Sequence, residues 1–229
     1  MTILYTLYKN TYIDLSHLDS TKGVTCYVNT TNRCPCACTF CLRQTKEMME
    51  NNSLWLKEEP SKEMIIEEFK KYDLNDFKEI VFCGFGEPME RWDDIKEVID
   101  YIRSVKKDMK IRINTNGLAN DIYGRDVTPE YKGRFDTVSI SLNAPTKEEF
   151  LELTRSKFGI SSFDDMLDFA KKCKAYVPNV VLTVVDIIGE EKIEACRKIT
   201  DEIGITLRDT VSNHILKLQS FQSVPLISR

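Results

Sequence analysis

The sequence predicts an α/β fold in which a parallel sheet carries its helices on the outside. Two observations support this prediction. From Val24 onward, short runs rich in β-branched residues alternate with longer helical segments, which is the pattern of successive βα units. At about 30 residues per unit, the 229 residues accommodate roughly six units. We therefore expect a partial parallel barrel of the (β/α)6 type, preceded by a short N-terminal β extension.

The N-terminal extension is predicted from a local alternation. Residues from Met1 to Leu15 alternate between apolar and polar around Lys9-Asn10, which is typical of a hairpin or a pair of edge strands. We assign residues 1–20 to this extension and expect it to have no catalytic role.

The core, which we place at residues 21–208, contains strand-like and helical segments in alternation. Strands are predicted from Thr25 to Thr30, Glu79 to Cys83, Lys110 to Asn114, Thr137 to Leu142 and Val180 to Asp186. Helices are predicted from Lys62 to Tyr72, Trp92 to Lys107, Phe163 to Ala175 and Glu190 to Ile203. Gly204 is typical of a helix end, and Ile205 to Leu207 is a short strand candidate.

The C-terminal tail, residues 209–229, departs from this alternation. Ser212-Asn213-His214, the polar stretch from Gln219 to Ser223, and Pro225 stand where a clear terminal strand is expected. The tail is either a mobile lid over the open side of the barrel or an irregular terminus. The second interpretation is favoured, because chain termini are usually poorly ordered.

Composition and charge exclude several classes of protein. The net charge is −4 and the isoelectric point is about 5.4, so the chain has no broad electrostatic attraction to phosphate backbones and nucleic acid is not indicated as a partner. No apolar run approaches the roughly 20 residues of a membrane helix, and the N-terminus lacks the basic and apolar regions of a secretion signal. We therefore expect a cytoplasmic protein without a membrane partner.

The cysteines point to a metal site. Four of the eight crowd between Cys34 and Cys41, whereas the others are scattered singly, and such clustering without a secretion signal favours a metal site over a disulfide framework. Cys34, Cys38 and Cys41 form a CxxxCxxC loop that can hold an iron–sulfur cluster by three thiolates. One iron of a four-iron cluster would then stay open for a cofactor or substrate, as in catalytic metal sites.

Two alternatives concern the same loop. A zinc knuckle would use Cys34, Cys36, Cys38 and Cys41, because zinc also favours closely spaced thiolates, and the chain would then be a non-catalytic zinc-binding interaction module. In the cluster interpretation Cys36 is a bystander, since a free cysteine commonly packs as a small apolar residue.

Further motifs accompany the cysteine spacing. Phe40 directly precedes the last cysteine, Gly84-Phe85-Gly86-Glu87-Pro88 follows one apolar strand, Asn114-Thr115-Asn116-Gly117 follows a second, and Ser139-Ile140-Ser141-Leu142-Asn143 lies on a third. Together they resemble the radical S-adenosylmethionine (radical SAM) enzymes, over a region from Val24 to Gly204. The resemblance is closest to the radical SAM proteins associated with TatD-type hydrolases, which show a similar Thr-Asn-Arg-Cys-Pro opening and a similar Ser-Leu-Asn-Ala strand end.

The resemblance implies an enzyme that binds a [4Fe–4S] cluster and S-adenosylmethionine. Reductive cleavage of this cofactor would produce a 5′-deoxyadenosyl radical, which abstracts hydrogen from an unidentified substrate. An electron donor of the flavodoxin or ferredoxin type is implied, together with a small-molecule or peptide substrate and, by family association, a TatD-type hydrolase. A glycyl-radical activase is an alternative within the class, because the scattered cysteines form no second cluster motif.

The resemblance also assigns cofactor-binding residues. The metal ligands are Cys34, Cys38 and Cys41, and the cofactor contacts are Phe40, Gly84, Gly86, Glu87, Pro88, Asn114, Asn116, Ser141, Asn143 and Arg155. The methionine ammonium needs acceptors, which strand-end carbonyls and the Glu87 carboxylate supply.

The resemblance assigns three of these residues to particular parts of the cofactor. Ser141 and Asn143 lie two residues apart on a predicted strand and would face the adenosyl ribose together. Arg155 suits the cofactor carboxylate through its planar fork, although an exposed surface position is equally compatible with its sequence context.

Overall fold

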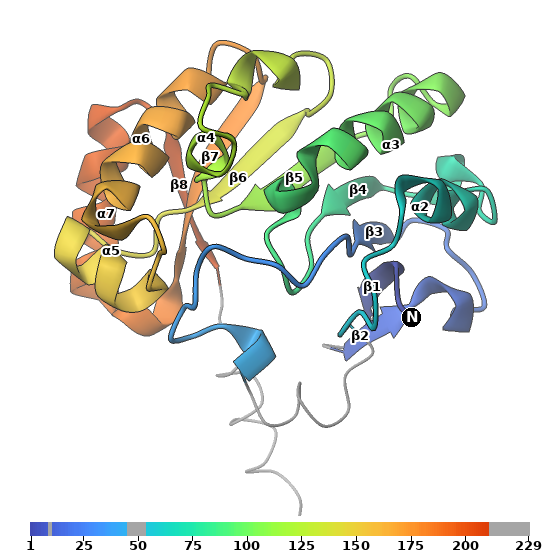
Figure 1. Ribbon diagram of the computed structural model, residues 1–229, viewed down its shortest axis with the longest axis horizontal. Helices are drawn as coiled ribbons and strands as arrows, with labels where there is room; N and C mark the ends of the chain where they lie inside the picture. The colour runs from blue at the N-terminus through green and yellow to red at the C-terminus, as the bar shows by residue number, and fades with distance from the viewer. Residues whose placement is uncertain (9–10, 45–53, 211–229) are drawn as a thin grey trace, which may run out of the picture.

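The computed structural model describes residues 1–8, 11–44 and 54–210, and these form one eight-stranded sheet in the order β2-β1-β3-β4-β5-β6-β7-β8 (Figure 1). From β3 onward each strand pairs in parallel with the next, so six parallel strands make up the core of the sheet. They are β3 (Thr25–Val28), β4 (Glu79–Phe82), β5 (Ile111–Thr115), β6 (Thr137–Ser141), β7 (Asn179–Val185) and β8 (Thr206–Thr210). The sheet is open, with β2 and β8 at its edges, which confirms the predicted partial barrel.

The helices lie along one face of the curved sheet (Figure 1). They are α2 (Lys62–Phe69), α3 (Trp92–Val105), α4 (Ala119–Tyr123), α5 (Lys147–Thr154), α6 (Ser162–Cys173) and α7 (Glu190–Glu202). In α3, Ile95, Val98, Ile99 and Ile102 are buried and recur at the spacing of one helix face. Alternate strand residues such as Ile111 and Ile113 pack in the same core cluster, so burial of this layer holds helices and sheet together.

The N-terminal hairpin extends the sheet at the β3 edge. Strands β1 (Leu4–Tyr8) and β2 (Thr11–Asp14) pair antiparallel, and β1 pairs antiparallel with β3. The Tyr5 ring stacks on Tyr27 of β3, with ring centroids 5.2 Å apart. The predicted turn at Lys9-Asn10 lies outside the described residues.

The sequence prediction missed two helices and shortened one strand. Helix α5 begins at a capping residue, Thr146, whose hydroxyl accepts from the Glu149 N–H at 3.3 Å, so a capping signature was present in the sequence. Helix α4 is only five residues long and follows the Asn116-Gly117 turn signal. Strand β8 continues beyond the predicted Leu207 to Thr210 and pairs with β7, so a regular terminal strand is present. The predicted tail from residue 211 onward lies outside the described residues.

In the described part of the chain, no helix is both long and apolar enough to cross a membrane.

The helix-facing side of β6 gives a stability prediction. Leu142 follows β6 and is fully buried in the core cluster with Ile140. Leu142→Ala should therefore lower the free energy of unfolding by about 2–5 kcal/mol, through lost burial and the cavity left behind. Urea unfolding measures this change. Val105→Ala is the control, because that side chain is 57% exposed and the change should stay within about 0.5 kcal/mol. Equal stability of the two variants would contradict the assigned face.

Candidate functional site

The cysteine loop, residues 34–41, follows β3 at the carboxyl edge of the parallel sheet, the edge where ligands bind in open α/β sheets. Figure 1 shows the chain running from β3 across this edge toward α5. The Ala37 N–H donates to the Thr154 carbonyl at 2.9 Å and the Thr39 N–H donates to the Leu153 carbonyl at 2.9 Å. Backbone hydrogen bonds thus hold the loop against the last turn of α5.

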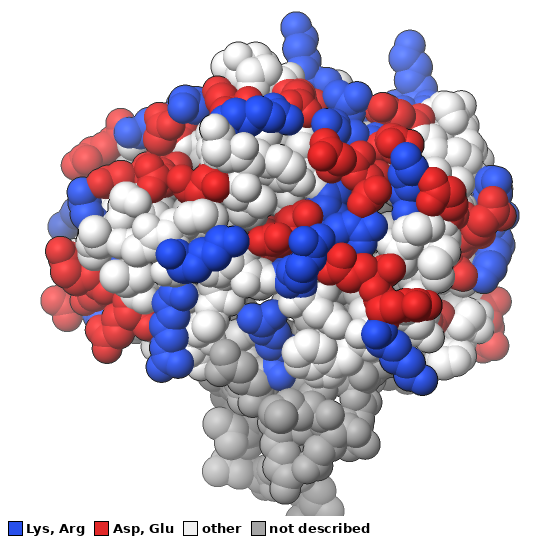
Figure 2. All heavy atoms as spheres, viewed as in Figure 1, with Lys and Arg blue, Asp and Glu red and all other residues white. Residues whose placement is uncertain are grey.

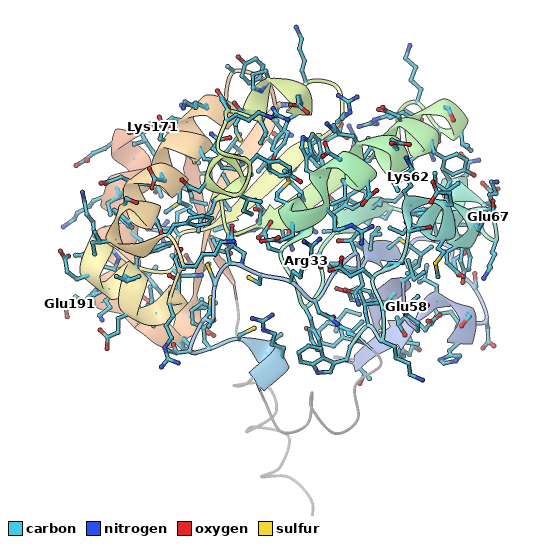
Figure 3. All side chains as sticks on the ribbon, in the orientation of Figure 1. Arg33, Glu58, Lys62, Glu67, Lys171 and Glu191 are labelled. Carbon is cyan, nitrogen blue, oxygen red and sulfur yellow. The ribbon has the colours of Figure 1, made fainter. Side chains whose placement is uncertain are left out.

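The segment leading into the cysteine loop is held by the turn at residues 84–88. The Gly86 N–H donates to the Thr31 carbonyl at 3.0 Å, and the Glu87 N–H donates to the Arg33 carbonyl at 2.8 Å. Arg33, labelled in Figure 3, also forms an ion pair with Glu59 at 2.8 Å. The turn therefore positions the chain directly before Cys34.

The two glycines of this turn permit a close approach to the segment after β3, Gly84 to the Asn29 side chain and Gly86 to the backbone of Thr31 and Arg33. A Cβ atom at Gly86 would lie 2.4 Å from the Thr31 carbonyl oxygen, and one at Gly84 would lie 2.3 Å from Asn29 Oδ1. Residues 29–33 occupy the space that side chains at these positions would need. The predicted contacts of Gly84 and Gly86 with the cofactor stay a prediction.

Glu87 is bonded inside the protein. Its side chain is 4% exposed, and Oε1 accepts from the Met89 N–H at 3.1 Å and the Thr115 hydroxyl at 2.7 Å. Oε2 accepts from the Asn116 N–H at 2.7 Å. Pro88 begins the short 3₁₀ helix Pro88–Arg91, where its missing N–H is tolerated. Glu87 thus joins the turn to the end of β5, and its contact with the cofactor ammonium stays a prediction.

The thiols of the loop differ in burial and in pKa. Cys36 is 4% exposed, while Cys34, Cys38 and Cys41 are half-buried. The Cys36 thiol is in hydrogen-bonding contact with the thiols of Cys34 and Cys38. This contact lowers the pKa of Cys34 to about 6 and also lowers the pKa of Cys38. Burial raises the pKa of Cys41. A lowered pKa favours the thiolate, the form that binds iron.

The donor set of the loop suits an iron–sulfur cluster, since three half-buried thiols share one short segment and thiolates are the usual ligands of such clusters. Within residues 1–8, 11–44 and 54–210, no three His, Cys, Asp or Glu side chains are grouped as a site for a single metal ion. The assignment of Cys34, Cys38 and Cys41 as ligands remains a prediction.

Arg43 closes the cysteine loop from its far end. Its guanidinium donates from NH1 to the Asn32 carbonyl and from NH2 to the Cys36 carbonyl, both at 3.1 Å. The sequence prediction did not include this residue. Its place two residues after Cys41 is the only available signal, and arginine carries enough donors to bridge two carbonyls.

Asn116 joins the turn at residues 84–88 to the cysteine loop. Its backbone N–H bonds Glu87, and its side-chain Nδ2 lies 3.8 Å from Cys36 Sγ. Its Oδ1 accepts from the Leu118 N–H at 3.0 Å, directly before α4. Asn114, by contrast, lies within β5 and accepts from Arg112 at 2.9 Å.

The predicted pairing of Ser141 with Asn143 needs a correction. Strand β6 ends at Ser141, and Asn143 has a left-handed backbone with φ 57°, so strand alternation does not extend to it. The Asn143 Oδ1 accepts from the Val185 N–H at 3.2 Å, at the end of β7. The two residues therefore share the carboxyl edge of the sheet but not one strand face.

Arg155 and Phe40 flank the cysteine loop. Arg155 ends α5 in a left-handed conformation with φ 49°, and its side chain is exposed. Its neighbour Thr154 accepts the hydrogen bond from Ala37, which places Arg155 beside the loop. Phe40 is half-buried next to Cys41.

The family follows from a comparison with protein-family models. The model of the Radical SAM superfamily matches residues 28–203, which include the cysteine loop and all three of the strand motifs that follow it. The chain belongs to the radical SAM superfamily. Members of this superfamily are enzymes that use a [4Fe–4S] cluster and S-adenosylmethionine. A search of curated protein sequences finds no match.

Solved radical SAM structures share the fold. The chain is similar to a radical SAM methyltransferase from Sphaerobacter thermophilus, with 13% identity and a TM-score of 0.57 over 90% of this chain and 66% of that one. It is similar to Streptococcus suis SuiB bound to S-adenosylmethionine, with 18% identity and a TM-score of 0.53 over 86% and 42%. It is also similar to native anSMEcpe with bound AdoMet, with 18% identity and a TM-score of 0.57 over 81% of this chain and 50% of that one. The chain thus spans between 42% and 66% of the length of these proteins.

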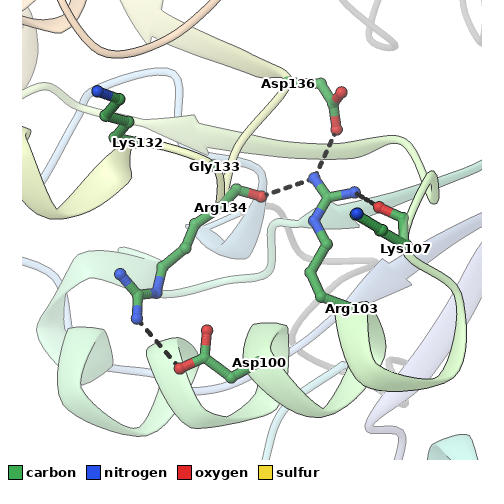
Figure 4. A pocket seen from close by; sticks show the side chains of 7 residues that line it. All are labelled: Asp100, Arg103, Lys107, Lys132, Gly133, Arg134 and Asp136. Atoms are coloured by element: carbon green, nitrogen blue, oxygen red, sulfur yellow. Dashed lines mark hydrogen bonds and ion pairs between the residues drawn. The ribbon is translucent and has the colours of Figure 1, made fainter.

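One cavity of the radical SAM domain lies away from the predicted site. It has a volume of about 510 Å³ and is lined by Asp100, Arg103, Lys107, Lys132, Gly133, Arg134 and Asp136 (Figure 4). Asp136 directly precedes β6, so the cavity lies at the amino edge of the strands. Arg103 is bonded there to Asp136 at 2.8 Å and to the Arg134 carbonyl at 3.0 Å.

Figure 2 shows basic and acidic side chains interspersed over the viewed face.

The burial of Glu87 predicts a dependence of stability on pH. Burial raises the pKa of Glu87 to about 8, whereas a carboxyl in an unfolded chain has a pKa of about 4.3. Between these values the folded chain binds more protons, so this group lowers the free energy of unfolding as the pH rises, by up to about 1.4 kcal/mol per pH unit.

Urea unfolding of the wild-type chain and of Glu87→Gln, from pH 5 to pH 8.5, measures this dependence. The stability of the wild type relative to the variant should fall across the range, because glutamine does not titrate. A difference that is constant with pH would show that Glu87 is ionised throughout.

Proposed function

We propose that this chain is a radical SAM enzyme that cleaves S-adenosylmethionine reductively at a [4Fe–4S] cluster held by Cys34, Cys38 and Cys41. The observation that carries the proposal is the placement of the cysteine loop at the carboxyl edge of the sheet by backbone bonds to α5 and to the turn at residues 84–88. When bound, the cluster and cofactor supply a 5′-deoxyadenosyl radical that removes hydrogen from a substrate.

The residues of the chain orient these groups. Gly86 and Glu87 position the segment before Cys34, and Arg43 bridges the carbonyls of Asn32 and Cys36. Asn116 is hydrogen-bonded to both Glu87 and Cys36, so it links the turn at residues 84–88 to the cysteine loop. Such support keeps a cofactor site close to one geometry, as catalysis requires.

The cofactor contacts are proposed from their places around the loop. Phe40 and the turn at residues 84–88 would enclose the methionine end. Asn114 lies within β5, Ser141 ends β6, Asn116 and Asn143 follow these strands, and all four would face the adenosine. Arg155 is exposed beside the loop, where its guanidinium could pair with the cofactor carboxylate.

A second candidate function rests on Cys36. Its thiol lies in hydrogen-bonding contact with Cys34 and Cys38, and a zinc-binding interaction module would use these three thiolates together with Cys41. Among the described residues, however, no three such side chains are grouped as a site for a single metal ion. A glycyl-radical activase is the alternative within the enzyme class.

The partners and the location of the protein are also proposals. An electron donor of the flavodoxin or ferredoxin type, a small-molecule or peptide substrate, and an association with a TatD-type hydrolase are supported by the sequence resemblance. A cytoplasmic location is proposed because the cysteine clustering fits a metal site in a reducing compartment.

The first prediction from this function concerns metal content. Anaerobically reconstituted protein should bind about four irons and four sulfides per chain, and alanine at Cys34, Cys38 or Cys41 should remove them. Cys36→Ala is the matched control within the same loop and should retain the cluster. Iron and sulfide analysis with the visible absorption spectrum measures this. Stoichiometric zinc without sulfide, lost in Cys36→Ala, would favour the zinc module instead.

A second prediction concerns the cofactor. The reconstituted chain with a chemical reductant should convert S-adenosylmethionine to 5′-deoxyadenosine, measured by chromatography under anaerobic conditions. Ser141→Ala should weaken cofactor binding by about 0.5–1.5 kcal/mol, the usual net value of one hydrogen bond. Ser104→Ala, on the exposed side of α3, is the control and should bind normally. Equal affinity of both variants would remove Ser141 from the site.

A further inference from the structure

The face of the sheet opposite the helices carries two arginines. Arg112 lies on β5 between Ile111 and Ile113, and Arg208 lies on β8 after Leu207. The three apolar neighbours belong to the core that packs against the helices. Because strand side chains alternate between faces, both guanidinium groups project to the inner, concave side of the partial barrel.

Arg112 is already neutralised on this face. Its NH2 lies 3.0 Å from Glu79 Oε2, its Nε lies 3.2 Å from both oxygens of the same carboxylate, and its NH1 donates to Asn114 at 2.9 Å. The side chain is only 15% exposed. A bidentate pair of this kind fills most of the donors of a guanidinium, so Arg112 is a structural cation.

Arg208 has a different environment. Its NH2 donates to Ser139 Oγ at 3.1 Å, reaching across β7 to β6. Among the residues that the structure describes, no carboxylate lies within ion-pair distance of Arg208. Partial burial and the nearby Arg112 lower the pKa of Arg208, while Glu79 and Tyr27 act in the opposite direction. A guanidinium offers five donors, and one neutral hydroxyl uses one of them.

Arg208 borders the proposed cofactor contacts, because it lies in register with Thr183 and, through it, with Ser141. Ser139, its hydrogen-bond partner, lies two residues before Ser141 along β6, farther from the carboxyl edge that carries the cysteine loop. The side chain is exposed and therefore accessible from the concave side. Strand β8 lies at the opposite end of the parallel strands from β3, which leads into the cysteine loop. A group bound by Arg208 would thus lie beside the proposed adenosine contacts and away from the cysteine loop, where a substrate can be presented to the cofactor.

We propose that Arg208, oriented by Ser139, binds an anionic oxygen group, a carboxylate or a phosphate, of the substrate. The inference rests on the proposed function, because it takes the concave face as the substrate side of a radical enzyme. The geometry points to a substrate with at least one such group, since a planar guanidinium matches both carboxylate and phosphate through paired hydrogen bonds.

The test uses the full chain with its reconstituted cluster and two simple probes, inorganic phosphate and malonate. Calorimetric titration should show that at least one of them binds with a millimolar dissociation constant, and the preferred probe distinguishes a phosphate from a carboxylate substrate. Arg208→Gln should weaken binding at least tenfold. Arg125→Gln is the matched control, because Arg125 is a half-exposed arginine of the helix layer paired with Glu130; its affinity should stay within twofold of the wild type.

Three results would overturn the proposal. The first is that neither probe binds to the wild type at up to 50 mM, and the second is that Arg208→Gln binds the probe with unchanged affinity. The third is that S-adenosylmethionine displaces the anion competitively, which would assign Arg208 to the cofactor carboxylate. If Arg208→Gln does not fold, Arg208→Lys replaces it. Lysine keeps the charge without the planar fork, so binding should weaken at least threefold, and unchanged affinity would again overturn the proposal.

The test of anion binding by Arg208 can fail independently of the test of the proposed function. Anion binding needs no turnover, whereas formation of 5′-deoxyadenosine by the wild type tests the radical chemistry itself. Cleavage of the cofactor without Arg208-dependent anion binding contradicts only the present inference. Anion binding without cleavage, at full cluster occupancy, contradicts the proposed function.

Discussion

The close contact between the turn after β4 and the segment after β3 positions the rest of the site. Two backbone hydrogen bonds, from Gly86 and Glu87 to the carbonyls of Thr31 and Arg33, fix the chain directly before Cys34. The contact exists because Gly84 and Gly86 have no Cβ, which would clash at 2.3–2.4 Å with Asn29 and Thr31. Short backbone approaches of this kind are rigid, so the cysteine loop starts from a defined point on the sheet.

Glu87 carries this constraint further into the protein. Its two carboxylate oxygens bond Met89, Thr115 and Asn116, and Asn116 in turn reaches Cys36. Burial disfavours the charged carboxylate and raises its pKa, while three donors compensate part of that cost. These bonds form a polar connection between the end of β5 and the cysteine loop. If Glu87 also bound the cofactor ammonium, that contact would compete with the hydrogen bonds to Met89, Thr115 and Asn116.

The two faces of the sheet have separate tasks. The helix side is apolar and supplies stability through residues such as Ile113, Ile140 and Leu142, all fully buried. The concave side carries polar and charged groups, among them the Glu79–Arg112 pair and Arg208. This division is what strand alternation allows, and it lets the same strands hold the fold together and present chemistry to a ligand.

The sequence by itself determined the order of βα units, the cysteine spacing and the motif at each strand end, because periodicity and spacing are local properties. The capping residue of α5 was also readable, although the prediction overlooked it. Tertiary structure alone decided that Gly84 and Gly86 make room for the segment after β3, that Asn143 leaves the strand, and that Arg208 meets Ser139, 69 residues away. Such contacts depend on the register and curvature of a sheet built from distant segments, which no local pattern specifies.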